Sequence, residues 1–310
     1  MNRKLLAIIT ILFTVSLSTY YYLWYSDPLN SVTESPYLTP TIIKRMQIMV
    51  DDTPEELPNE LRSITIARGE FPSWFRLAKG HTTETLFEFV TYQLVYDVGY
   101  SIIDPVHSKA LHDTMIWAYD YDEEAYNKMQ KSLEKAHQIY FTHEHWDHFA
   151  GAFNTELFDK IKHVIYVSKA QRNSDMMASM KDGFISLSQL DKVNVIDNKG
   201  LYKISPGVVL FNVPGHTPGN QGMYIKLKNG TEILLVGDIA YSMANITLEV
   251  GKPRISSHII LGEDSEAVNS QIKSLIRIKN EFPNIHIVPA HDIPNNRKLV
   301  EQGIIKKGLH

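Results

Sequence analysis

The sequence predicts an α/β protein in which two β-sheets are packed between outer layers of helices. Short β-like runs occur in the first half of the chain and again in the second half, and each set is closed by a segment with helical spacing. The chain has 310 residues, of which 44% are hydrophobic and 21% are charged. A chain of this size and composition can bury one substantial core.

The N-terminal segment, residues 1–25, has the composition of a membrane segment. Leu5–Trp24 carries no charged residue and has the length that a bilayer core requires, and Arg3 and Lys4 precede it. Aromatic residues gather at its far end: Tyr20, Tyr21, Tyr22, Trp24 and Tyr25. We expect a transmembrane anchor that leaves the rest of the chain outside the cytoplasm. The alternative is a cleaved signal peptide, with Leu5–Val15 as its apolar region, and the protein would then be secreted.

The next segment, residues 26–80, is rich in proline and acidic residues. We expect a tether here, with a peripheral helix at Pro40–Met49. The catalytic domain is expected over residues 81–310. It begins with two β-like runs, LFEFVTYQLVYD and YSIID, which Val98 and Gly99 can join as a hairpin.

The following elements are predicted from periodicity and from turn residues. Glu123–His137 has helical spacing and an acidic first turn, which suits the helix dipole. A second helix is expected at about Ser265–Asn280. The further β-like runs, in chain order, are QIYFT, HVIYVS, KVNVI, GVVLFNVPG, GMYIKL, EILLVGD and HIVPA.

Composition excludes several classes of function. A formal net charge of −4 and a pI near 6.4 give no basic surface, so we expect no nucleic-acid partner. The chain contains no cysteine, which excludes disulfides, thiolate metal sites and a cysteine nucleophile. Histidine, aspartate and glutamate are therefore the strong metal ligands that remain.

The run THEHWDHFAG, residues 142–151, concentrates such ligands directly after the apolar strand QIYFT. A structural cluster of histidines gains little at neutral pH unless something bridges the ring nitrogens. His143 and His145 are two residues apart, so they can project to one side of an extended segment and bind one cation. Asp147 and His148, on the turn that follows, can reach a second cation.

Three more candidate ligands follow predicted strands. His216 lies in PGHTPGN, where two Pro-Gly pairs favour a tight loop. Asp238 ends the run EILLVGD, and His291 lies in PAHD after the last strand. Each of these residues alone is a weak signal, because a lone histidine or aspartate after a strand is more often a surface residue. Their order after THEHWDH makes the set informative.

Taken together, HxHxDH, GHTPG, GD and a late histidine resemble the ordered ligand set of the metallo-β-lactamase superfamily. The resemblance covers roughly residue 85 to the C-terminus and implies an αββα sandwich with two zinc ions per chain. It implies that His143, His145 and His216 hold one zinc, that Asp147, His148 and His291 hold the other, and that Asp238 bridges them. Manganese, iron and cobalt suit the same donors. Hydroxide held between two such cations is a strong nucleophile at neutral pH.

Within the superfamily, the run GDIAY resembles the N-acyl homoserine lactonases, in which an Asp-x-x-Tyr element places a phenol beside the substrate carbonyl. The resemblance implies a lactone or other small ester as the substrate. Tyr241 would stabilise the oxyanion, and Asp147 would pass a proton to the leaving alkoxide. A core aromatic is the alternative role for Tyr241.

Other functions stay open at this point. Another hydrolase of the same fold could act on a thioester, a phosphodiester or a β-lactam, and a non-catalytic membrane-tethered metal-binding protein is the alternative from a different class. Beside the metal motif, Trp146 and Phe149 are expected to pack in the core, with a pocket wall as the alternative. The remaining histidines are expected to be structural or exposed. The sequence does not specify the oligomeric state.

Overall fold

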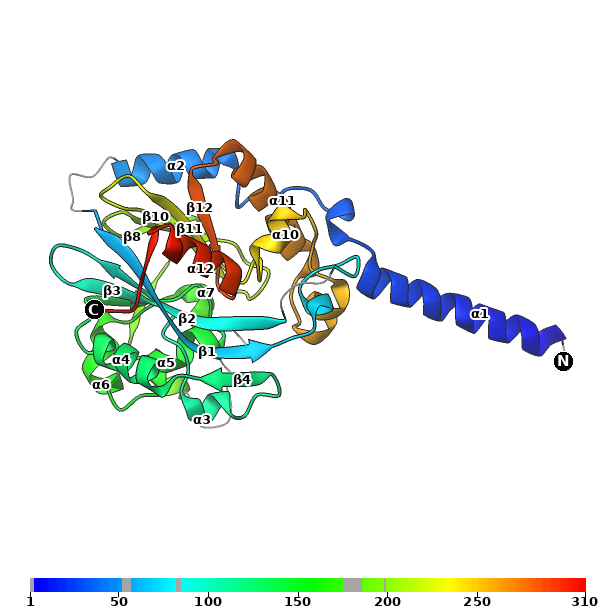
Figure 1. Ribbon diagram of the computed structural model, residues 1–310, viewed down its shortest axis with the longest axis horizontal. Coiled ribbons are helices and arrows are strands. Elements are labelled where there is room, and N and C mark those ends of the chain that lie inside the picture. The colour runs from blue at the N-terminus through cyan, green and yellow to red at the C-terminus, as the bar shows by residue number, and fades with distance from the viewer. Residues whose placement is uncertain (1–2, 52–56, 82–84, 175–185, 198) are drawn as a thin grey trace.

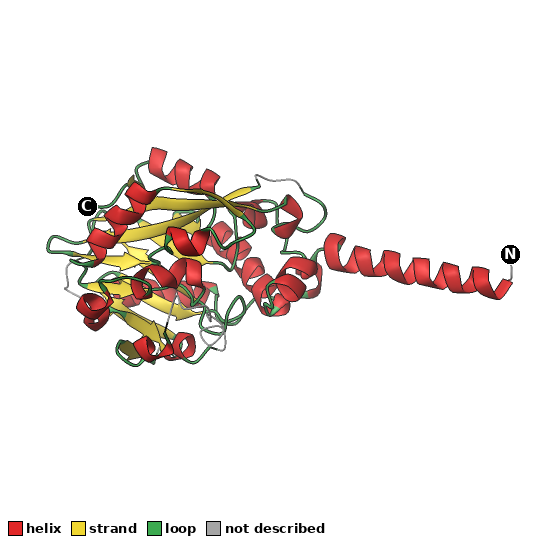
Figure 2. Cartoon of the chain, turned by 90° about the horizontal axis from the view of Figure 1, so that it is seen from below, coloured by secondary structure: helices red, strands yellow, loops and turns green. Residues whose placement is uncertain are grey.

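The computed structural model describes residues 3–51, 57–81, 85–174, 186–197 and 199–310. Two β-sheets lie face to face in the middle of the molecule, and helices cover the outer side of each sheet (Figure 1, Figure 2). The α/β sandwich predicted from the sequence is confirmed.

The first sheet has the strand order β13-β1-β2-β3-β5, and β4 pairs with β1 beside β13. Its strands are β1 (Glu60–Glu70), β2 (Leu86–Val95), β3 (Tyr100–Ile103), β4 (Ala118–Tyr121), β5 (Gln138–Tyr140) and β13 (Ile305–Lys307). The expected hairpin joins β2 and β3 in antiparallel register. Gly99 turns it with φ +77, and a side chain there would collide with the ring of His137.

The second sheet has the strand order β12-β11-β10-β9-β8. Its strands are β8 (Leu201–Ser205), β9 (Val208–Asn212), β10 (Gln221–Lys226), β11 (Glu232–Gly237) and β12 (Ile285–Pro289). β11 and β12 are parallel, and the other neighbours are antiparallel. A separate parallel pair is formed by β6 (Tyr166–Ser168) and β7 (Asn194–Ile196).

Helices complete the two outer layers. The α-helices of the folded domain are α2 (Pro40–Asp51), α3 (Lys109–His112), α4 (Glu123–Leu133), α5 (Trp146–Phe153), α6 (Phe158–Ile161), α7 (Lys169–Arg172), α9 (Leu187–Leu190), α10 (Met243–Thr247), α11 (Ser265–Glu281) and α12 (Ile293–Glu301). Shorter or irregular turns are η2 (Pro28–Ser31), η3 (Ser73–Phe75), η4 (Lys162–Val164) and η5 (Ile255–Ile260). Asp122 and Asp264 begin the two helices predicted from the sequence, because their carboxylates accept hydrogen bonds from the backbone of the first turn.

Apolar side chains fill the space between the sheets. Leu94, Ile103 and Tyr140 come from the first sheet and meet Leu210 and Met223 of the second, and all five are buried. The same strands present a second apolar face outward, to α4 and α5 on one side and to α2 and α11 on the other. The strands β9 and β11 are therefore buried on both faces, which explains their nearly unbroken apolar sequence.

The expected boundary at residue 81 is wrong, because residues before it belong to the sandwich. β1 is a central strand of the first sheet, paired with β2 along its whole length. Charged residues such as Arg62 and Arg68 interrupt the apolar pattern of this strand, and the sequence therefore gave a weak β signal. The helix expected at Pro40–Met49 forms as α2, but it is not peripheral. Residues 52–56 of the expected tether lie outside the described part of the chain.

The N-terminal segment projects away from the sandwich as one exposed helical rod (Figure 1). It comprises α1 (Arg3–Tyr20) and η1 (Tyr21–Tyr25). By length and composition this segment is able to cross a membrane, and a signal sequence would fit the same description. Anchor and signal peptide therefore both stay predictions.

Met46 tests whether α2 is part of the folded domain. Its side chain is fully buried between α2 and the second sheet. Met46→Ala is therefore expected to lower the free energy of unfolding by about 2–4 kcal/mol, because it removes apolar contacts and leaves a cavity. Urea denaturation of the purified chain, followed by circular dichroism, measures this loss.

Ile48 provides the matched control in the same helix, because its side chain is 57% exposed. Ile48→Ala should change the free energy of unfolding by no more than about 0.5 kcal/mol. If both variants were equally mild, α2 would be peripheral after all.

Candidate metal centre

The candidate ligands lie where strands of both sheets end. His143 and His145 follow β5, and α5 begins directly after them with Asp147 in its first turn. His216 lies on the loop between β9 and β10, Asp238 follows β11, and His291 follows β12. All of the predicted ligands, seven residues, fall into overlapping groups that could hold a metal ion.

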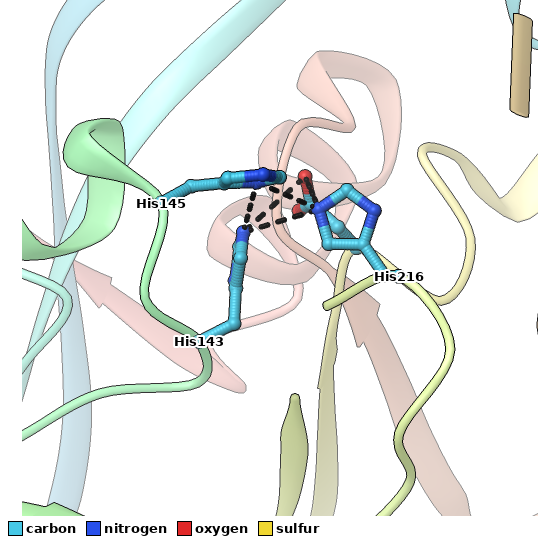
Figure 3. A group of neighbouring side chains, drawn as sticks. His143, His145 and His216 are labelled. Atoms are coloured by element: carbon cyan, nitrogen blue, oxygen red, sulfur yellow. Dashed lines mark hydrogen bonds and ion pairs between the residues drawn. The ribbon is translucent and has the colours of Figure 1, made fainter. Parts of the chain in front are cut away.

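Three imidazole rings form the first group, and Figure 3 shows them pointing toward one another. His145 Nδ1 lies 2.9 Å from both His143 Nε2 and His216 Nε2, and the latter two nitrogens are 3.2 Å apart. Nitrogens bound at 2.0–2.1 Å to one tetrahedral cation would be about 3.3 Å apart. The Oδ2 atom of Asp238 lies 3.3 Å from His216 Nε2 and supplies a fourth donor.

The second group lies on the other side of the same carboxylate. His148 Nε2 and His291 Nε2 are 3.4 Å apart, and Asp147 Oδ2 lies 3.5 Å and 3.7 Å from them. Asp238 Oδ2 is 3.1 Å from His291 Nε2, and Asp238 Oδ1 is 3.7 Å from His148 Nε2. Asp238 thus contacts both groups. Among the described residues, none donates a hydrogen bond to its buried Oδ1.

A second layer of acceptors fixes the outer nitrogens of these rings. His148 Nδ1 donates to Asp104 Oδ2 at 2.9 Å, and His216 Nδ1 donates to Glu263 Oε1 at 2.5 Å. His291 Nδ1 donates to the backbone carbonyl of Glu88 at 2.7 Å. These acceptors favour a proton on the outer nitrogen of each ring, so that in a metal-bound, neutral ring the inner Nε2 would present its lone pair to the centre.

Asp104 also holds the segment that carries the first histidines. Its carboxylate accepts from the backbone nitrogen and from the hydroxyl of Thr142, both at 2.7 Å. Sequence reasoning did not identify this residue, although it follows β3 as Asp238 follows β11. The position of this aspartate directly after a strand could therefore have marked it as a residue of the site.

Glu144 connects two of the ligand loops. It lies between the first two histidines and is fully buried, and its carboxylate accepts from Thr217 Oγ1 at 2.7 Å and from Gly219 N at 3.0 Å. A side chain at residue 219 would come within 2.6 Å of this carboxylate, so glycine is required for the close approach. The hydrogen bonds keep the His143–His145 segment beside the loop of His216.

A buried lysine, Lys252, contacts two of the residues at the centre. Its ammonium group donates to Glu263 Oε1 at 2.8 Å and to the backbone oxygen of Asp238 at 2.6 Å. It also lies 4.0 Å from the ring centroid of Tyr241. Lys252 and Glu263 were not predicted, because no local pattern in the sequence connects them to the histidines.

Burial and neighbouring charges set the protonation of the ligands. Burial lowers the pKa of His143 and His145 well below the usual histidine range, which favours neutral rings. Burial alone would raise the pKa of Asp238, but the surrounding histidines, first of all His291, outweigh it and hold that pKa well below its usual value. Burial would likewise lower the pKa of His148, but Asp147 and Asp104 outweigh it and raise this pKa to about 10.

A cavity of about 350 Å³ lies against the cluster. Asp147, Asp238, Tyr241 and His291 line its inner end. Aromatic side chains form much of the remaining wall: Phe71, Phe87, Phe89, Trp117 and Trp146. The cavity can therefore receive a molecule with a polar end and an apolar end.

The two residues beside the metal motif have different roles. Trp146 lines the cavity, which is the alternative considered for it, whereas Phe149 is fully buried against Phe141 and Phe153. Of the histidines expected to be structural or exposed, His107 and His112 are buried and lie behind the cavity wall, with their rings 3.1 Å apart at the nearest nitrogens.

Lys252→Met tests whether the buried ion pair of Lys252 with Glu263 stabilises the centre. The variant leaves the Glu263 carboxylate buried without its cation, so the free energy of unfolding is expected to fall by about 3–5 kcal/mol. Urea denaturation in the presence of a chelator measures this loss without a contribution from bound metal. Lys109→Met is the control, because the Lys109–Asp113 pair is half exposed and is worth at most about 1 kcal/mol. Equal losses in the two variants would contradict a supporting role for Lys252.

Curated relatives resemble the chain in sequence over about half of its length. An N-acyl homoserine lactonase from a Bacillus species is 31% identical over 162 residues, which make up 51% of this chain and 57% of that protein. The chain thus spans little more than half the length of the curated relatives it matches.

Solved structures agree with the fold. A quorum-quenching N-acyl homoserine lactone lactonase superposes with a TM-score of 0.60 and 21% identity, over 79% of this chain and 97% of that one. AidC, described as a dizinc quorum-quenching lactonase with a bound product, superposes with a TM-score of 0.53 and 16% identity, over 77% of this chain and 90% of its own. At these identities the likeness shows a shared fold.

The sequence pattern of the metallo-beta-lactamase superfamily matches residues 94–291, which include all of the residues in both ligand groups. As the resemblance of its motifs indicated, the chain belongs to the metallo-beta-lactamase superfamily.

Proposed function

We propose that this chain is a metal-dependent hydrolase that opens a lactone, with N-acyl homoserine lactones as the substrate class. The observation that carries the proposal is the pair of ligand groups sharing Asp238 at the inner end of an aromatic cavity. The similar lactonase and the shared fold support the choice of substrate.

The donor set fits two zinc ions per chain. His143, His145 and His216 would hold one ion, and Asp147, His148 and His291 the other. Asp238 would bridge the two, because its buried Oδ1 lacks a hydrogen bond from the described residues while Oδ2 faces both groups. All donors are nitrogen or oxygen, so manganese, iron and cobalt also suit the centre.

The chemistry divides between the metals and the side chains. Bound divalent cations polarise a carbonyl and make water acidic enough to act as a nucleophile near neutral pH. Water adds to the lactone carbonyl carbon, the ring carbon–oxygen bond breaks, and the leaving alkoxide takes up a proton to give a hydroxy acid. Asp147 lies at the cavity wall, where its carboxylate can carry that proton.

Tyr241 is placed to act on the carbonyl oxygen. It lines the cavity beside Asp238 and His291, with its ring centroid 5.6 Å from that of His291. Burial raises the pKa of the Tyr241 phenol well above its usual value, so the hydroxyl stays protonated and can donate a hydrogen bond. The aromatic wall opposite would hold the acyl chain.

We also propose that the helix Arg3–Tyr25 anchors the protein in a membrane, with the catalytic domain on the extracytoplasmic side. The positive charges of Arg3 and Lys4 before the apolar stretch support this orientation. Contacts of Trp24 and Ser26 with the folded domain support an uncleaved segment. Removal of the segment as a signal peptide would instead give a secreted enzyme.

Metal analysis and a substrate panel test the proposed activity. The purified chain should contain about two zinc ions and should hydrolyse N-acyl homoserine lactones, and removal of the metal with a chelator should abolish turnover. A thioester, a phosphodiester and a β-lactam are included under the same conditions. Turnover of one of these without any lactone would overturn the substrate class. Two bound metals without any turnover would favour a metal-binding protein.

Tyr241→Phe separates a catalytic phenol from a packing aromatic. The variant keeps the ring but loses the hydroxyl, so kcat on a lactone is expected to fall about 100-fold while the zinc content stays unchanged. Tyr119→Phe is the control, since that side chain is 60% exposed and lies on β4. Unchanged kcat in Tyr241→Phe would assign Tyr241 to the core.

A further inference from the structure

The inner end of the N-terminal helix is fastened to two loops of the folded domain. The Trp24 ring lies 6.4 Å from Trp74 of η3, and Lys79 N donates to the backbone oxygen of Tyr25 at 3.1 Å. On the other side, Arg254 lies 4.4 Å from the ring of Tyr22 and donates to the Ser26 hydroxyl at 2.9 Å. Figure 1 shows both segments, in cyan and yellow-orange, at the end of the molecule from which α1 emerges.

The same two loops form one side of the cavity at the metal centre. Phe71 and Arg76 flank η3, and Ile260 and Leu261 end η5, and all four line the cavity. η3 and η5 also contact each other. The part of the wall that closes the cavity toward α1 is therefore built from the segments that hold α1.

A continuous row of aromatic rings leads from the helix to the centre. Trp74 and Phe75 are neighbours in η3, with ring centroids 6.1 Å apart, and Phe75 lies 6.1 Å from Tyr241. Phe71 stacks on Phe75 at 4.2 Å. Phe75 itself is buried, so an apolar chain that enters beside α1 would contact Phe71 and Ile260, which line the cavity, while Phe75 packs behind Phe71.

The outer surface at this place is apolar as well. Ile259 and Ile260 of η5 are 58% and 52% exposed, and the run Ile255–Leu261 contains no Lys, Arg, Asp or Glu. Exposed aromatic residues of the helix, Tyr21 and Tyr25, lie at the same end. Adjacent exposed apolar side chains near an aromatic belt are typical of a surface that enters the interfacial layer of a bilayer.

We propose that the mouth of the cavity between η3 and η5 faces the membrane in which α1 is inserted, and that the substrate is a long-chain acyl lactone drawn from that membrane. This inference rests on the proposed lactone hydrolysis and on the proposed anchoring by α1. A long acyl chain partitions into lipid, so it would reach the cavity without crossing water. The lactone ring would enter the metal centre first, and the acyl tail would lie along Phe71 and Ile260 toward the bilayer.

The position of η5 can be tested without any assay of activity. The chain has no cysteine, so Ile259→Cys provides a unique attachment point for an environment-sensitive fluorophore. In the full chain reconstituted into phosphatidylcholine vesicles, the label should be quenched by spin-labelled lipid. Ile48→Cys on α2 is the matched control, with a side chain 57% exposed, and its label should not be quenched. Equal quenching at the two positions, or none at residue 259, would overturn the proposed orientation.

The substrate class is tested in the same vesicles with N-butanoyl and N-dodecanoyl homoserine lactone. Ile259→Asp should lower kcat/KM for the dodecanoyl substrate about tenfold and leave the water-soluble butanoyl substrate unchanged. Ile48→Asp should change neither value. An equal fall for both substrates, or no fall for the dodecanoyl one, would overturn the delivery of substrate from lipid. Failure of the unsubstituted chain to hydrolyse either lactone would instead contradict the proposed function, and the fluorescence result would still decide the orientation.

Discussion

The carboxylate of Asp238 is the point on which the arrangement of this centre depends. Five histidine rings and a second carboxylate, Asp147, converge on one largely buried place, and Asp238 is the group that contacts both halves. Imidazole nitrogens and carboxylate oxygens that point their lone pairs at one another in the interior repel one another unless positive charge lies between them. A cation between them would supply that charge, and the protein holds the donor atoms close enough together to bind one.

The positions of these donor atoms are maintained by residues that hydrogen-bond to the rings and loops from outside the centre. Asp104, Glu263 and the carbonyl of Glu88 orient one ring each, and Glu144 joins the two loops that carry the first group. These partners come from different elements, since Asp104 follows β3, Glu88 lies in β2 and Glu263 lies between η5 and α11, so several parts of the fold together fix the ring nitrogens. Strand ends are suited to this task because their backbone positions are fixed by the sheet, whereas the loops that follow are free to differ.

Much of the candidate centre was predictable because its candidate ligands occupy short local patterns after apolar strands. THEHWDH, PGHTPG, GD and PAHD can each be recognised within a few residues. Lys252 and Glu263 could not be recognised in this way, since Glu263 lies 47 residues from the histidine it orients and neither residue stands in a pattern. β1 was missed for another reason. Its two ends carry charged side chains, and its role as a sheet strand depends on pairing with β2 and β13, which no local window contains.

The pairing of β1 with β13 has a consequence for the way the molecule is made. Arg62 of β1 donates to the carbonyl of Gly308, a contact between residues 246 positions apart. Contacts of such high sequence separation are costly in chain entropy and slow to form. During synthesis, the part of β1 that pairs with β13, Leu61 to Ser63, would stay uncovered on that edge until almost the whole chain had left the ribosome. If α1 directs export, most of the chain can therefore cross the membrane before the first sheet is able to close, which keeps it in the unfolded form that such transport requires.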